Sequence, residues 1–287
     1  MDTYKKGVLL AAIASILLGT ENIIIKFAYQ QSNFQTILIT RGITMILIAA
    51  IYIIVTKKSF RLETKDRASM FIIAIFSIIS SFLFIYAIKE VTATNASILS
   101  TMQPVFIILA GLILLGKSGN LKKSSYIAII FMIIAGLVIT SKSFTNIINL
   151  NIWSIGELLI ILSVLASGTA DVLVKKHFKK LNPVLIVFYI YTISSLIFIL
   201  MFAKHLSPLS FSWWAVVIGI LHISQAVLYY QSIKLIKVAK VSAIGLLVPV
   251  TAILLAFIIL KEVITLVQFI GMIILFIGFY ILTKRKE

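Results

Sequence analysis

Two ionisable side chains stand inside long apolar runs of this chain, Glu21 in the first run and Arg41 in the second. At ~1.5 Å of rise per helical residue, both lie about 10–12 Å below the same membrane surface. Either charge alone would be costly in hydrocarbon, so the sequence predicts a Glu21–Arg41 ion pair. Such a pair serves either as a static strut between the two helices or as an outer gate or charge-binding site for a substrate.

Larger polar side chains recur at helical spacing further along. His222, Gln225 and Tyr229 follow one another in steps of three and four, which places them on one helix face, and Ser97 and Thr101 share a face in the same way. In hydrocarbon, a polar face must point at protein or at a wet cavity. The His222 stripe favours a cavity lining, whereas small hydroxyl residues equally suit close helix packing. Imidazole titrates near neutrality, so His222 is either a proton carrier or a hydrogen-bonded core residue.

Asp171 stands four residues before Lys175, a spacing that favours a local ion pair at the end of a helix. Ser163 and Ser167 precede Asp171 at the same spacing, so this helix also has a polar face. The sequence predicts the local pair for Asp171.

Two prolines mark an internal repeat. Residues 83–115 align without a gap on residues 228–260, at an offset of 145 that pairs Pro104 with Pro249, and Gly19 recurs as Gly168 at an offset of 149. Each proline removes a backbone hydrogen bond and tends to kink its helix, so we expect paired bends around a central cavity. An odd number of membrane spans in each copy inverts the second copy, which is the usual construction of secondary transporters.

Composition places the whole chain in lipid. The mean hydropathy is +1.14, and hydrophobic residues make up 61% of the 287 residues while charged residues make up 12%. A soluble chain of this size could not bury so much apolar surface. We expect ten membrane helices, each about 20 residues long as ~30 Å of hydrocarbon requires. They fall at 8–29, 34–56, 68–88, 92–115, 122–141, 152–174, 183–203, 211–233, 239–260 and 264–283.

The net charge of +17 is explained by orientation rather than by nucleic acid. With a cytoplasmic N-terminus, the cytoplasmic segments hold 20 of the 26 Lys and Arg residues and the outer segments hold four. This distribution follows the positive-inside rule, and the basic segments suit contact with anionic lipids on the cytoplasmic side. We therefore expect an all-α integral membrane protein of the cell membrane, with both termini cytoplasmic and no nucleic-acid partner.

Enzyme chemistry finds no support in the sequence. Gly111–Ser118 matches the P-loop pattern, but its variable residues are Leu-Ile-Leu-Leu at the end of an apolar helix rather than a flexible phosphate-binding turn. With no cysteine, the chain has no disulfide framework and no thiolate metal site. We expect no catalytic residue, no cofactor and no metal.

Several short motifs stand along the chain: Gly19-Thr20 with Lys26, Gly168-Thr169 with Lys175, Arg41, Tyr86-Ala87, the Ser97/Pro104 helix and Lys261-Glu262. In these motifs the chain resembles the EamA-type branch of the drug/metabolite transporter superfamily. Some positions depart from the family pattern: Leu18 replaces a common Trp, Gly116-Lys117 replaces Gly-Glu, and Ile190 stands opposite Arg41.

The resemblance implies two inverted five-helix repeats, at residues 1–141 and 152–287, joined by an external connector at 142–151. It implies a basket in which helices 1, 3, 4, 6, 8 and 9 surround a central cavity while helices 5 and 10 lie at the periphery. It also implies export of a small metabolite, such as an amino acid, by alternating access. We expect the protein to be a monomer in the bacterial plasma membrane. Efflux of cationic drugs and a non-transporting scaffold or sensor are the alternatives. The candidate cavity or gate residues are Glu21, Arg41, Tyr86, Ser97, Thr101, His222, Gln225 and Tyr229, with Pro104 and Pro249 as kinks.

Overall fold

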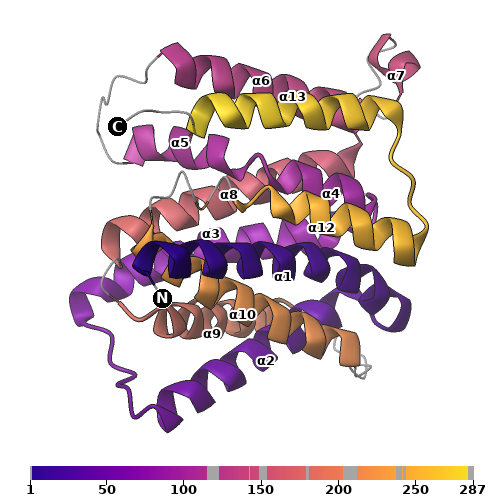
Figure 1. The fold of residues 1–287 in the computed structure, drawn as a ribbon. Helices are drawn as coiled ribbons and strands as arrows, with labels where there is room; N and C mark the ends of the chain where they lie inside the picture. The colour runs from indigo at the N-terminus through magenta and orange to yellow at the C-terminus, as the bar shows by residue number, and fades with distance from the viewer. Residues whose placement is uncertain are drawn as a thin grey trace.

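The computed structural model describes residues 2–114, 123–141, 143–148, 154–178, 181–202, 212–236, 241 and 244–283. Every regular element in these ranges is helical, and the helices form one bundle (Figure 1). They are α1 (Thr3–Gln31), α2 (Phe34–Val55), α3 (Thr64–Ala87), α4 (Ala93–Ser100), α5 (Gln103–Leu114), α6 (Lys123–Ser141), α7 (Phe144–Ile148), α8 (Ile155–His177), α9 (Pro183–Phe202), α10 (Trp213–Leu235), α12 (Leu247–Leu255), the π-helix η2 (Ala256–Leu260) and α13 (Leu266–Thr283).

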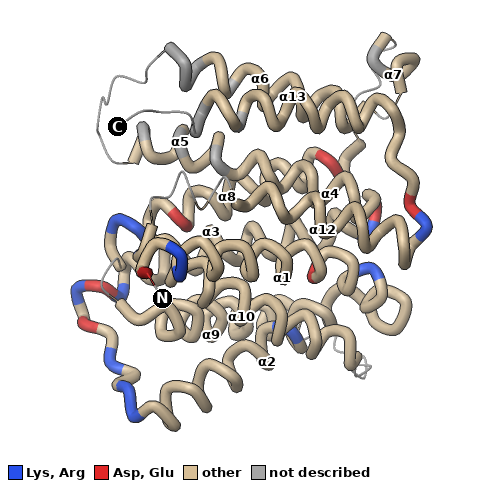
Figure 2. The backbone as a smooth tube through the Cα atoms, in the orientation of Figure 1, with Lys and Arg blue, Asp and Glu red and all other residues tan. Residues whose placement is uncertain are grey.

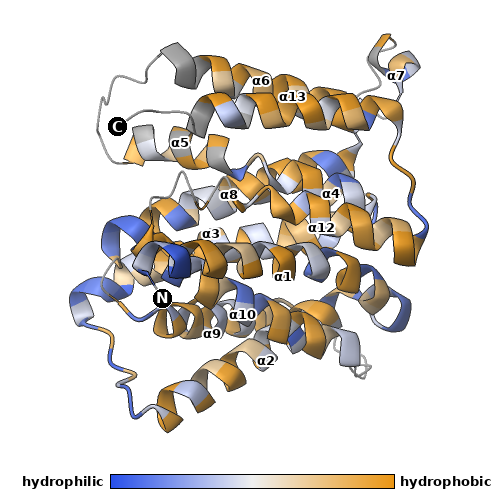
Figure 3. Cartoon of the chain, viewed as in Figure 1, coloured by the Kyte–Doolittle hydropathy of each residue, from blue (hydrophilic) through white to orange (hydrophobic). Residues whose placement is uncertain are grey.

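The helices match the apolar runs of the sequence. In the described part of the chain, seven helical stretches are long and apolar enough to cross a membrane, counting α4 and α5 together as Ala93–Gly111. Three shorter apolar helices, Ile130–Ser141, Leu247–Leu260 and Leu266–Gly278, fall within the other three predicted ranges. Hydrophobic residues cover most of the bundle, and the hydrophilic ones gather at its two ends (Figure 3). The chain is therefore a multi-pass membrane protein.

Glycine contacts show that the two halves pack in the same way. A Cβ atom added to Gly7 in α1 would lie 2.6 Å from Ile236, and one added to Gly156 in α8 would lie 2.7 Å from Val91. The two glycines are 149 residues apart and their neighbours are 145 apart, which are the offsets of the sequence repeat. Each pair of helices therefore meets at the same point in both halves, where only glycine leaves enough room.

The two halves run in opposite directions through the bundle. Near the end of α1, Tyr29 donates a 2.6 Å hydrogen bond to the carbonyl of Ile85, near the end of α3. In contrast, α8 starts beside the end of α3, and its last residue, His177, lies 3.4 Å from Ser69 near the start of α3. The first helices of the two halves are thus antiparallel, as an inverted repeat requires.

The fourth predicted helix is broken rather than kinked. It stops at Ser100 and resumes at Gln103, with the amide of Thr101 turning back to the Ile98 carbonyl at 3.1 Å. Pro104 explains the break, because it has no N–H for the Ser100 carbonyl and fits best in the first turn of a new helix. Pro249 stands at the matching place in α12, just after a turn at residues 245–246. Instead of the predicted kinks, the described residues show an interruption before Pro104 and a turn before Pro249.

Helices α6 and α13 pack along each other as an outer layer of the bundle (Figure 1). Gly271 of α13 lies against the backbone of α6, since an added Cβ would meet the Ile139 amide nitrogen at 3.2 Å. This is the peripheral position expected for the fifth and tenth helices. The short helix α7 falls within the segment expected to be a polar connector.

The start of α4 is held by side chains from elsewhere in the chain. Glu262 accepts hydrogen bonds from the amides of Ala93 and Thr94, each at 3.1 Å, and so caps this helix from the far end of η2. Asn95 donates to Glu157 at 3.1 Å and accepts from Gln268 at 2.5 Å. A carboxylate at a helix N-terminus is stabilising, so Glu262 ties the second half to the first.

Basic residues are distributed unevenly between the two ends of the bundle. Figure 2 shows most of the coloured Lys and Arg residues at the end where the N-terminus lies, and few at the opposite end. Gly116 and Lys117, which contribute to both the P-loop match and the departure from the family pattern, lie outside the described residues.

Candidate functional site

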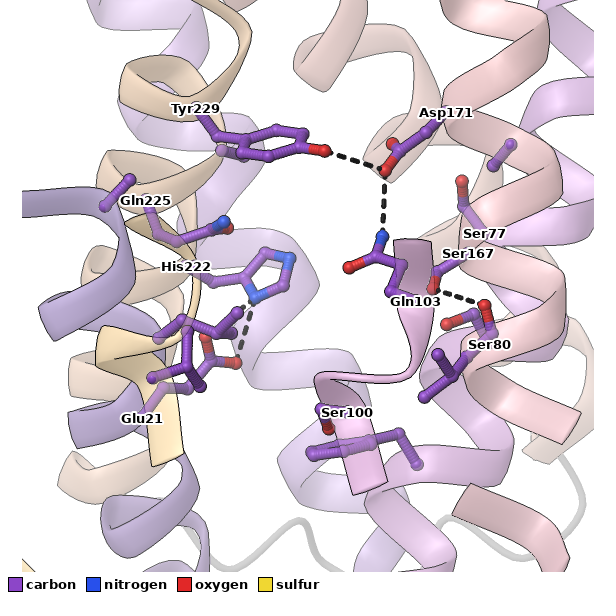
Figure 4. Close-up of a pocket in the computed structure, with 18 of the residues that line it drawn as sticks. Glu21, Ser77, Ser80, Ser100, Gln103, Ser167, Asp171, His222, Gln225 and Tyr229 are labelled. Carbon is purple, nitrogen blue, oxygen red and sulfur yellow. Dashed lines mark hydrogen bonds and ion pairs between the residues drawn. The ribbon is translucent and has the colours of Figure 1, made fainter. Parts of the chain in front are cut away.

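A cavity of about 240 Å³ lies in the middle of the bundle. Its wall comes from α1, α3, α8 and α10, from the broken α4–α5 helix and from the turn before α12. These are the six expected helices, but α2 and α9 also contribute, through Arg41 and through Val187, Ile190 and Tyr191. Figure 4 shows His222, Gln225 and Tyr229 on one wall, facing Asp171 and a group of serines on the other.

Three charged or titratable groups meet on one wall. Glu21 lies 3.6 Å from Arg41 Nη1, so the predicted ion pair is confirmed. Glu21 is only 2% exposed and Arg41 only 4% exposed, so both groups are removed from water. His222 joins the pair from the second half, because its Nδ1 lies 2.8 Å from Glu21 Oε2. The predicted pair is therefore part of a larger cluster that connects three helices.

The contacts of His222 define its hydrogen-bonding state. Its Nδ1 faces the Glu21 carboxylate, which only accepts, so Nδ1 carries a proton. Arg41 Nη2 lies almost equally far from both ring nitrogens, at 3.2 Å from Nε2 and 3.3 Å from Nδ1, and the Tyr191 hydroxyl lies 2.6 Å from Nε2. Nδ1 therefore donates to Glu21, and the ring lies in contact with Glu21, Arg41 and Tyr191.

Asp171 does not form the local ion pair predicted for it. Its carboxylate accepts from Gln103 Nε2 at 2.8 Å and from the hydroxyls of Tyr229 and Tyr230, each at 3.4 Å. Lys175, the predicted partner, is exposed at the end of α8. The prediction was wrong because helical spacing alone gave no sign of the neutral donors that reach Asp171 from α5 and α10. The carboxylate instead belongs to the cavity wall.

Most serine and threonine hydroxyl groups of the wall donate hydrogen bonds to backbone carbonyls of their own helices. Ser77 donates to the Ile73 carbonyl at 2.9 Å, Ser100 to Ala96 at 2.7 Å and Ser167 to Val164 at 3.0 Å. A hydroxyl has one proton and two lone pairs, so each of these oxygens remains able to accept a hydrogen bond. Ser15 and Thr101 make the same kind of bond. These five hydroxyl groups can therefore accept hydrogen bonds from a ligand in the cavity.

The lining follows the sequence repeat in position but not in chemistry. Thirteen pairs of positions related by the two offsets both line the cavity, and in most of them the two side chains differ in charge or polarity. Among these pairs are Glu21 with Ala170, Asn22 with Asp171, Arg41 with Ile190, Ser77 with His222, Ser80 with Gln225 and Phe84 with Tyr229. The repeat thus creates one central space, and its charges are asymmetric.

Six of the eight predicted cavity or gate residues line this space, namely Glu21, Arg41, Thr101, His222, Gln225 and Tyr229. Tyr86 is 47% exposed at the edge of the bundle, where its ring lies edge-on to Phe34 and parallel to Phe82. Ser97 is fully buried and accepts a 2.7 Å hydrogen bond from Asn22. The two kink prolines are not among the lining residues: Pro249 is buried, and the side chain of Pro104 lies outside the described residues.

Sequence reasoning missed Tyr191, Tyr230, Gln103 and Asn22 as lining residues. Two of them carried a usable signal, because Asn22 is the repeat partner of Asp171 and Gln103 directly precedes Pro104. In the part of the chain that the structure describes, no group of three or more His, Asp and Glu side chains is placed to hold a metal ion.

Comparisons with known proteins agree on the fold and the class. A solved crystal structure superposes with a TM-score of 0.66 over 96% of each chain at 12% identity, which supports the fold alone. The pseudopaline exporter CntI of Pseudomonas aeruginosa (strain UCBPP-PA14) is 24% identical over 222 residues, covering 77% of this chain and 75% of the exporter. The model of the EamA-like transporter family matches twice, at residues 5–141 and 154–284, and the chain therefore belongs to this family of membrane transporters.

Proposed function

We propose that this chain is a secondary transporter that exports a small polar metabolite by alternating access. The observation that carries the proposal is the central cavity, whose wall is built from repeat-related positions of two antiparallel halves. Binding at the interface of inverted repeats is how many secondary transporters expose one site to each side in turn. A curated relative that is itself an exporter supports the direction.

The proposal includes a topology of ten membrane crossings, with the repeats at 1–141 and 152–287 and the connector at 142–151 outside the cell. Both termini are then cytoplasmic, and the basic end of the bundle in Figure 2 faces the anionic lipids of the inner leaflet of a bacterial plasma membrane. The cavity is complete within one chain, which favours a monomer as the working unit.

The broken helices offer a physical basis for alternating access. Ser100, Thr101 and Gln103 line the cavity at one break, and Gly245 and Leu246 line it at the other. Because the two breaks are related by the repeat, the halves can exchange conformations by bending at equivalent places. No step of this cycle involves a bond being made or broken in the substrate.

The alternatives are less well supported by the cavity. Its volume of about 240 Å³ falls below the ~300–1,000 Å³ of sites that hold drug-sized ligands. Because Glu21 is paired with Arg41, its carboxylate is not free to bind a cationic drug. A scaffold or sensor would be expected to have a sealed centre, whereas this centre holds a cavity with polar and charged side chains in its wall.

Export can be tested by filling the cavity. Ser167→Trp on α8 places an indole in the lining, and Leu165→Trp places the same group on an exposed part of the same helix. Metabolites should accumulate in the medium of cells that overproduce the wild type or Leu165→Trp, but not Ser167→Trp. A metabolite found this way should then exchange across proteoliposomes that contain the purified protein. Equal export by both tryptophan variants, or no difference from empty cells, would contradict the proposal.

A further inference from the structure

The carboxylate of Asp171 is placed as a binding group rather than as part of a structural ion pair. It lines the cavity, and its contacts among the described residues come from the neutral donors Gln103, Tyr229 and Tyr230. The two tyrosine contacts are long, at 3.4 Å each, so they hold the carboxylate loosely. A charge in such a place is costly unless a cation compensates it.

Among the described lining residues, no basic side chain contacts Asp171. The lining contains the carboxylates Glu21 and Asp171 and the single guanidinium Arg41. Arg41 pairs with Glu21, and Nδ1 of His222 faces the same carboxylate. In this described lining, Asp171 is therefore the acidic side chain without a basic partner.

The surroundings of Asp171 suit a hydrogen-bond donor with positive charge. Ser167 and Ser77 lie on the same wall, and both hydroxyls donate to their own backbones and so leave acceptor oxygens for a ligand (Figure 4). The rings of Tyr229 and Tyr230 lie 5.7 Å apart beside the carboxylate. Aromatic faces attract a nearby ammonium group, and a carboxylate forms charge-assisted hydrogen bonds with it.

We propose that Asp171 is the binding site for a protonated amine of the transported metabolite, with Tyr229, Tyr230 and the Ser167 oxygen around the ammonium group. The inference rests on the proposed function and adds a substrate class to it: small compounds with a basic amine. A carboxylate on the ligand is not required, because Arg41 is committed to Glu21. The repeat partner of Asp171 is Asn22, so the second half alone contributes this charge.

The test uses three probes that share a phenethyl group and differ in the group attached to it: phenethylamine, 2-phenylethanol and 3-phenylpropionate. Binding is measured on the purified full-length protein in nanodiscs by calorimetry and by the shift in its unfolding temperature. Phenethylamine should bind wild-type protein at least tenfold more tightly than either other probe. Asp171→Asn, which keeps the size of the side chain, should weaken phenethylamine binding about tenfold or more, because it removes a charge-assisted contact.

Two further variants separate charge recognition from loss of fold. Asp171→Glu keeps the carboxylate and should retain most of the preference for the amine, and Lys175→Gln, on the exposed end of the same helix, should change nothing. Equal binding of the three probes, no binding of phenethylamine, or an amine affinity unchanged in Asp171→Asn would overturn the assignment. Export of a metabolite without a basic nitrogen would refute the amine site and leave the transporter proposal standing. Amine binding without any transport would refute the transporter proposal and leave the amine site standing.

Discussion

Removing Arg41 should expose how strongly the buried charge cluster depends on it. Arg41→Leu takes the guanidinium away from Glu21, which is 2% exposed and 3.6 Å distant. Loss of one partner of a buried ion pair costs ~3–5 kcal/mol, since the remaining charge is left uncompensated. His222 still contacts Glu21 at 2.8 Å, and Nε of Arg41 is buried without a hydrogen-bond partner. We therefore expect the lower end of that range, about 3 kcal/mol.

Equilibrium unfolding in mixed micelles measures this cost. Arg61→Leu removes the same charge from an exposed position between α2 and α3, and should change the free energy of unfolding by less than about 0.5 kcal/mol. The double variant Glu21→Gln/Arg41→Leu removes both charges and should be more stable than the sum of the single changes by ~1–3 kcal/mol. An Arg41→Leu protein with the same free energy of unfolding as Arg61→Leu would contradict a buried charge cluster. The same holds if the effects of Glu21→Gln and Arg41→Leu on the free energy of unfolding are additive.

Three further outcomes follow from the packing. Gly19→Ala should destabilise the protein by ~1–3 kcal/mol, because its Cβ would lie 2.6 Å from the Val248 carbonyl. Its repeat partner Gly168→Ala should cost clearly less, because there the closest atom lies at 3.3 Å; thermal unfolding of both proteins decides the order. Glu262→Ala should cost ~1–2 kcal/mol, because α4 loses the carboxylate that caps its first two amides, and amide hydrogen exchange should rise at the start of α4. Tyr86→Phe should leave export unchanged because its hydroxyl lies outside the cavity, whereas Tyr191→Phe should lower export through the lost contact with His222; initial rates of export test both.

The sequence predicted the positions of the apolar helices and the two offsets of the repeat. Apolar runs of membrane length predict spans directly, and the two offsets recovered from identical residues reappear in the structure as matched contacts of Gly7 with Ile236 and Gly156 with Val91. The break at residues 101–102 was predicted only as a kink. A proline pattern marks where a helix loses a hydrogen bond, but neighbouring helices decide whether it bends or stops.

The site was predicted in part, for a physical reason that differs from residue to residue. Glu21 and Arg41 were paired because a short loop makes their helices neighbours. His222 could not be joined to them, since it lies 201 residues after Glu21 and no local rule connects them. Asp171 was assigned to Lys175 because only contacts within one helix can be read from spacing. Tyr86 was selected through the family resemblance, and the structure places it at the edge of the bundle.

The most direct test of the account is the orientation of two repeat-related positions, Lys6 in α1 and Ile155 in α8. The chain has no cysteine, so Lys6→Cys and Ile155→Cys each create a single site for a maleimide that does not cross membranes. Both positions are exposed at the start of their helices. In intact cells, Ile155→Cys should be labelled and Lys6→Cys should not, while inside-out vesicles should give the opposite pattern. Labelling of both positions from the same side would contradict two inverted halves around a shared cavity.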